Sequence, residues 1–141
     1  MEMMVEKILR TRKPTFILEK TSLPRKDFYK ALEKWTNKKG QTLILFPESF
    51  FAQQVVPHLP IFHGGLKENE KAALWKAVQN GDIFLIAGTR TALFLPFKKL
   101  SCMVLDFEDH GSYEEIRQPK YHSLEVAEKL ADLWEVPLVI I

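Results

Sequence analysis

Short, uniformly apolar runs alternate with amphipathic stretches along this chain, and that alternation constrains its fold more than any other feature. Runs such as Thr42–Phe46 and Cys102–Asp106 lack the polar alternation of a half-exposed strand, so both faces of each strand are expected to be buried. The stretches between them carry apolar residues at helical spacing, as Phe28, Leu32 and Trp35 do. We therefore predict an α/β fold, a three-layer αβα domain with a mostly parallel sheet.

The predicted elements follow from these patterns together with proline and glycine positions. The predicted strands are Thr15–Glu19, Thr42–Phe46, Ile61–Phe62, Ile83–Ala87, Cys102–Asp106 and Pro137–Ile141. The predicted helices run from Pro24 to Lys39, from Glu48 to the residue before Pro57, from Lys67 to Asn80 and from Ser123 to Glu135. The stretch GTRTALFLPFKKL is read as the connection between two strands.

Length and composition indicate how many domains the chain forms and whether it crosses a membrane. The chain has 141 residues, of which 46% are hydrophobic, which is enough to bury one core, so residues 1–141 are predicted to form a single domain. No apolar run approaches the roughly 18 residues that cross a bilayer, and the start lacks a secretory h-region. We expect a cytoplasmic protein without a membrane partner. The single cysteine, Cys102, is expected to be a core residue, not a nucleophile.

Charge is distributed unevenly. Residues 1–39 hold 11 Lys or Arg and 5 acids, a balance of +6, whereas residues 40–141 hold 9 and 13, a balance of −4. The basic part could face phosphates, or it could be an ordinary solvated helix surface. The four histidines are scattered and do not have metal-ligand spacing, so no metal site is expected.

Four segments, in order and at matching spacing, resemble the first helicase lobe of the PriA family of superfamily 2 replication-restart DNA helicases. They are LILFPESFFAQQ (43–54), HGGLKENEKAALWKAVQNGDIFLIAGTRTALFLPFKKL (63–100), VLDFEDHGSY (104–113) and PKYHSLEVA (119–127). The resemblance implies a RecA-like lobe of the P-loop NTPase fold, with ATP at the carboxyl ends of the strands and single-stranded DNA across nearby loops. It also implies a second lobe that completes the ATP cleft, so this chain alone is not expected to unwind DNA.

The first ATP motif of the family departs from its pattern here. A phosphate-binding loop needs glycines, because its backbone N–H groups must converge on the phosphates. The corresponding segment, TSLPRKDFY (21–29), contains no glycine. Arg25 stands at the family's lysine and Lys26 at its magnesium-binding threonine.

The second ATP motif also departs from the pattern. Asp106 matches the family's magnesium-holding aspartate, but Phe107 replaces the glutamate that orients the attacking water. Glu108 is one position later and should face the wrong way. Arg25, Lys26, Asp106 and Glu108 are therefore interpreted as a vestigial nucleotide site without catalytic residues, and neither ATP hydrolysis nor a cofactor is expected. Asp106 could instead accept backbone N–H bonds or pair with a nearby base.

The loops that the family uses to contact DNA are better kept. The candidate DNA-binding residues are Gln53, His63, Gly64, Thr89, Arg90, Thr91 and Tyr113. Threonine hydroxyls, a guanidinium group and N–H groups beside glycines are suitable phosphate donors, so affinity should fall with salt.

Three of these candidates, Arg90, His63 and Tyr113, also have a structural interpretation. Arg90 could form an ion pair with Asp106 or Glu108. His63 could be a hydrogen-bonded turn residue. The segment with Tyr113, Arg117, Tyr121 and His122 resembles an aromatic loop of the family, and its rings could stack on bases or hold the loop on the domain.

The function that we infer is a PriA-like lobe lacking a competent ATP site, which acts as a single-stranded DNA-binding or structural module linked to DNA replication restart. Single-stranded DNA and replication or primosome proteins are the expected partners. Two alternatives stay open: a fragment of an active ATP-dependent DNA helicase, and a protein-interaction scaffold.

Overall fold

A computed structural model describes residues 15–17, 25–106 and 117–141. Within these ranges the strands form one six-stranded sheet in the order β1-β6-β5-β2-β4-β3, and every neighbouring pair is parallel. The strands are β1 (Thr15–Ile17), β2 (Gln41–Leu45), β3 (Ile61–Phe62), β4 (Leu85–Gly88), β5 (Leu100–Leu105) and β6 (Leu138–Ile140).

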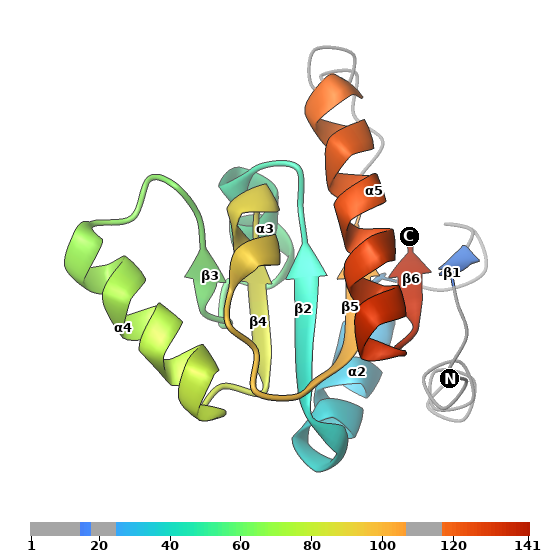
Figure 1. The fold of residues 1–141 in the computed structure, drawn as a ribbon, viewed down its shortest axis with the longest axis horizontal. Coiled ribbons are helices and arrows are strands. Elements are labelled where there is room, and N and C mark those ends of the chain that lie inside the picture. The colour runs from blue at the N-terminus through green and yellow to red at the C-terminus, as the bar shows by residue number, and fades with distance from the viewer. Residues whose placement is uncertain (1–14, 18–24, 107–116) are drawn as a thin grey trace.

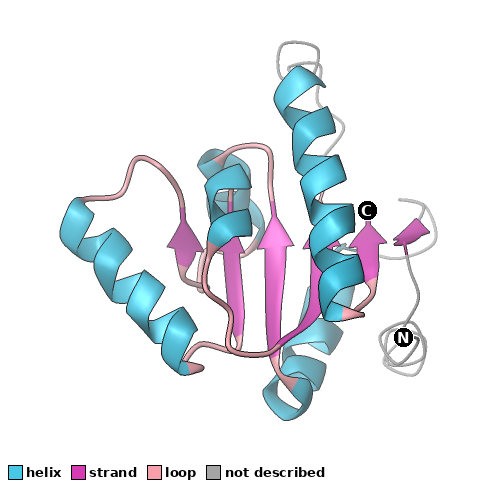
Figure 2. Cartoon of the chain, in the orientation of Figure 1, coloured by secondary structure: helices cyan, strands magenta, loops and turns pink. Residues whose placement is uncertain are grey.

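Helices cover both faces of the sheet (Figures 1 and 2). They are α2 (Arg25–Lys39), α3 (Ser49–Val55), α4 (Glu68–Asn80), the short 3-10 helix η1 (Arg90–Phe94) and α5 (Arg117–Trp134). In Figure 1, α2 and α3 lie behind the sheet, while η1 and α5 lie in front of it. The predicted αβα layering and parallel sheet are therefore confirmed.

Two apolar clusters fill the spaces between the layers. One joins α2 and α3 to the sheet through residues such as Phe28, Leu32, Ile44 and Val104, and Cys102 is fully buried in it. The other joins α4, η1 and α5 to the opposite face. Because both faces are buried, the central strands carry no polar alternation, which is why the sequence pattern was uniform.

Several predicted bounds were wrong, and three differences from the prediction have a local reason. β4 begins at Leu85 and not at Ile83, because the left-handed Gly81 ends α4 and the following turn uses the next residues. The connection after β4 contains η1. α5 begins at Arg117 and not at Ser123, since Pro119 lies in the first turn, where a helix tolerates proline.

Gln41 joins several connections at the amino-terminal edge of the sheet. Its Nε2 donates to the carbonyls of Val78 and Ile83, at 2.9 and 3.1 Å. Its Oε1 accepts from the backbone N–H groups of Lys98 and Lys99, at 2.8 and 2.9 Å. The side chain is buried, so this single amide satisfies backbone groups from the end of α4 and from the segment before β5.

Candidate nucleic-acid interface and the neighbouring nucleotide site

The carboxyl ends of four strands finish level with one another. Leu45 of β2 is in register with Gly88 of β4 and with Leu105 of β5, and Gly88 is in register with Phe62 of β3. The residues that follow these strands therefore leave the sheet side by side, at intervals of about 4.8 Å. This edge brings together the three segments that were predicted to contact DNA, and Asp106 as well.

Backbone hydrogen bonds fix the start of each loop at this edge. The N–H of Phe46 donates to Gly88 O at 2.9 Å, and that of Thr89 donates to Phe62 O at 3.1 Å. The N–H of Asp106 donates to Leu45 O at 2.8 Å. The order along the edge is therefore His63, Thr89, Phe46 and Asp106, and the Thr89 loop lies between the other two candidate segments.

Three segments approach one another closely at residue 88, and this position therefore requires glycine. A Cβ at this position would lie 2.4 Å from the Cβ of Ala92 and 2.8 Å from the carbonyl oxygen of Phe62. Neither neighbour is the flexible end of a long side chain. The turn from β4 into η1 can pack against β3 only if residue 88 has no side chain.

Arg90 is the exposed cation of the central loop. It begins η1, whose Ala92 and Leu93 are buried, so the helix is held against the domain while Arg90 faces solvent. Within the described part of the chain Arg90 has no ion pair, and its predicted alternative partner Asp106 is bonded elsewhere. The hydroxyls of Thr89 and Thr91 lie 3.5 Å apart beside it.

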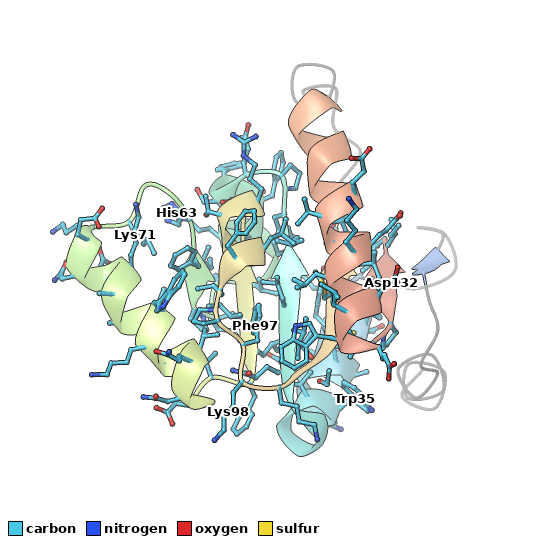
Figure 3. The ribbon with its side chains drawn as sticks, in the orientation of Figure 1. Trp35, His63, Lys71, Phe97, Lys98 and Asp132 are labelled. Atoms are coloured by element: carbon cyan, nitrogen blue, oxygen red, sulfur yellow. The ribbon has the colours of Figure 1, made fainter. Side chains whose placement is uncertain are left out.

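His63 and Gly64 form the turn that leads from β3 to α4. The N–H of Gly65 donates to Nδ1 of His63 at 3.1 Å, so His63 has the role of a hydrogen-bonded turn residue. Gly64 is exposed, and a Cβ there would meet no atom within 4 Å. The backbone at Gly64 is therefore open to a ligand. Figure 3 places His63 at this end of the molecule.

The charges around this turn are partly balanced. Glu70 accepts a hydrogen bond from the N–H of Lys67 at 3.2 Å, and Glu68 lies 3.6 Å from the ammonium of Lys71. Lys67 is exposed and was not singled out from the sequence, although it directly follows the matched turn. Together with Arg90 it supplies positive charge at this edge, while Glu48 adds an exposed negative charge.

The remaining candidate DNA-binding residues lie on α3 or outside the described residues. Gln53 is exposed on α3, which follows β2 at the same edge. Tyr113 lies outside the described residues. Arg117, Tyr121 and His122 belong to α5, so the prediction that they lie in a loop was wrong.

The vestigial nucleotide residues are only partly described. β1 and β5 are separated by β6 alone and are parallel, so β1 ends at the same edge of the sheet as Asp106. Arg25 and Lys26 open α2, and Lys26 is exposed. Residues 18–24 and Glu108 lie outside the described part of the chain.

Asp106 makes a buried contact with α2. The hydroxyl of Tyr29 donates to Asp106 Oδ2 at 2.7 Å, and the two residues are 4% and 0% exposed. The sequence had suggested a backbone N–H group or a base as a partner, and within the described residues a phenol is one donor to this carboxylate. Tyr29 was missed because nothing in a sequence links positions 77 residues apart.

Other reactive groups are few within the described residues. Burial raises the pKa of the Cys102 thiol well above its ordinary value, which agrees with the predicted core role. No cluster of three or more His, Cys, Asp or Glu side chains gathers in the described ranges. In the same ranges no helix has both the length and the apolar character for crossing a bilayer.

Comparison with known proteins finds relatives among the replication restart proteins PriA. The chain is 30% identical over 121 residues to the replication restart protein PriA of Bacillus subtilis, covering 80% of this chain. It is 31% identical over 112 residues to PriA of Synechocystis and 29% identical over 113 residues to PriA of Thermotoga maritima, covering 72% and 74% of this chain. The chain is related to PriA. It spans only 14–15% of the length of these PriA proteins.

A solved structure supports the fold. Domain 2 of the DEAD-box helicase Mss116p, solved bound to an RNA duplex, matches with a TM-score of 0.53 over 89% of this chain and 52% of that chain. At 14% identity this likeness concerns the fold alone, and it confirms the predicted RecA-like fold. No protein-family model matches the sequence.

Proposed function

We propose that this chain is a PriA-like lobe without a competent ATP site, which binds single-stranded DNA at the carboxyl edge of its sheet in the context of replication restart. The observation that carries the proposal is the level ending of β2, β3 and β4, which brings Arg90, Thr89, Thr91 and the Gly64 turn into one row. Donors of this kind hold a phosphate backbone without reading its bases.

The small number of cations at this edge determines how steeply the expected DNA affinity falls with salt. Arg90 and Lys67 are exposed cations of the loops in this row, so we expect one or two phosphate contacts. For a single strand this corresponds to a slope of about −1 in a plot of log affinity against log salt concentration. A much steeper slope would indicate a basic surface elsewhere on the chain.

Fluorescence anisotropy with a labelled oligonucleotide tests the proposal directly. Arg90→Ala should weaken binding about 10- to 150-fold, because a hydrogen bond to a charged group contributes roughly 1.5–3 kcal/mol. Lys99→Ala removes the same charge directly before β5, at the opposite edge, where Figure 3 shows the neighbouring Lys98, and should leave the affinity unchanged. Absence of binding at low salt, or equal effects of both substitutions, would contradict the proposed interface.

Magnesium-ATP provides a separate test of the proposal. Titration calorimetry should detect no binding heat, because the segment before α2 lacks glycines and Asp106 is buried against Tyr29. Appreciable binding would favour the alternative of an active helicase fragment. The large apolar side chains that are exposed, such as Phe50, Trp75 and Phe94, belong to different helices, which gives the scaffold alternative less support.

A further inference from the structure

The pair formed by Tyr29 and Asp106 stands where the RecA-like fold implies a magnesium ligand. Asp106 immediately follows β5, has no solvent-exposed surface, and accepts a 2.7 Å hydrogen bond from the Tyr29 hydroxyl. This length is ordinary for a hydrogen bond from a hydroxyl donor. The bond joins α2 to the end of β5.

The ring of Tyr29 is held by aromatic neighbours. Phe28 packs edge-on against it with ring centres 5.4 Å apart, and Phe46 lies on another side at 6.4 Å. Phe28, Tyr29 and Phe46 are all buried in the cluster that joins α2 to the sheet. The hydroxyl therefore cannot swing away from Asp106 without disturbing the packing of α2.

A hydrated magnesium ion does not fit this arrangement. Mg²⁺ needs nearly octahedral geometry with ligands at about 2.1 Å and keeps several of its waters. A carboxylate that has no contact with solvent and is bonded to a packed phenol can accept such an ion only after a packed neighbour moves. The residues present therefore disagree with the magnesium role that the fold implies for Asp106.

We infer that Tyr29 and Asp106 form a structural latch that fastens α2 to β5, and that Asp106 does not serve as a metal ligand in this chain. The inference deepens the proposed function, because it gives a physical reason for a silent ATP site. It concerns only the buried pair and is independent of the DNA-contacting loops.

Thermal unfolding of a double-mutant cycle tests the latch. Tyr29→Phe keeps the ring and removes the hydroxyl, and should lower Tm by about 5–10 °C. Asp106→Asn should also lower Tm. If the pair acts as a latch, the double variant should be no less stable than the weaker single variant. Additive losses would overturn the inference.

A matched control lies on the same helix. Thr36 is also fully buried, and its hydroxyl donates to the carbonyl of Glu33, one turn earlier, at 3.2 Å. Thr36→Val removes a buried hydroxyl that does not contact Asp106, so its loss should add to that of Asp106→Asn. The coupling energy between Thr36 and Asp106 should therefore be smaller than that between Tyr29 and Asp106. If the two coupling energies are equal, α2 responds as a whole, and a specific latch is overturned.

Divalent cations give the second measurement. Millimolar MgCl₂ or MnCl₂ should leave the Tm of the unmodified chain unchanged, since a bound ligand would raise it. A rise that disappears in Asp106→Asn would identify Asp106 as a metal ligand and overturn the inference. Oligonucleotide binding by Tyr29→Phe, measured below its Tm, should equal that of the unmodified chain, so failure of DNA binding and failure of the latch are recognised separately.

Discussion

Replacing Gly88 with alanine is expected to destabilise the domain by about 3 kcal/mol, because overpacking typically costs about 1–3 kcal/mol and a site that cannot relax lies at the upper end of this range. The new Cβ would lie 2.4 Å from the Ala92 Cβ and 2.8 Å from Phe62 O. Relief requires η1 to move away from β4 and β4 to move away from β3, which would also displace Arg90. Denaturant unfolding measures the loss of stability, and oligonucleotide binding by the folded fraction should weaken as well.

Two further variants make this prediction specific. Gly64→Ala adds a Cβ where no atom lies within 4 Å, so its free energy of unfolding should change by less than about 0.5 kcal/mol. Ala92→Gly in the Gly88→Ala background removes the closer of the two clashes and should restore part of the stability. If Gly88→Ala is as stable as the unmodified chain, the three segments do not approach as described.

The second large effect is expected at the opposite edge of the sheet. Gln41→Leu should lower the free energy of unfolding by about 3–5 kcal/mol, because four backbone groups lose a partner at roughly 1 kcal/mol or more each. These groups are the carbonyls of Val78 and Ile83 and the N–H groups of Lys98 and Lys99. Leucine fills a similar volume, so the loss reports hydrogen bonding more than packing.

A graded control uses a neighbour of Gln41. The hydroxyl of Ser101 donates a single bond, of 3.0 Å, to the backbone carbonyl of Gln41. Ser101→Ala should therefore cost about 1 kcal/mol in the same denaturant experiment. Equal losses for Ser101→Ala and Gln41→Leu would show that the Gln41 amide does not organise this edge.

The layered fold could be predicted because it depends on patterns within short windows. Ile61–Phe62 was predicted with its observed bounds, and the helix over residues 68–80 was predicted to within one residue. Apolar runs and the Gly81 stop are local signals that tertiary contacts reinforce here. The errors arose where two signals compete, as at Pro119, which reads as a break but occupies the first turn of α5.

The candidate site could be predicted only in part, because its decisive contacts are distant in the sequence. Motif matching selected Arg90, Thr89 and Gly64, and the level strand ends bring their loops together. No periodicity indicates that the Tyr29 hydroxyl meets Asp106, or that Gly88 approaches Phe62. Gln41 was likewise not selected from the sequence, because its four hydrogen-bond partners are distant along the chain.

The outermost strands have a consequence for self-association. β3 has two residues and β1 has three, whereas the interior β5 has six. A sheet border offers its unpaired amide and carbonyl groups to any other polypeptide, and the hazard grows with the length of that border. Within the described residues, the border formed by β3 offers a neighbouring molecule only two residues to pair with, so we expect little strand addition at that side of the sheet.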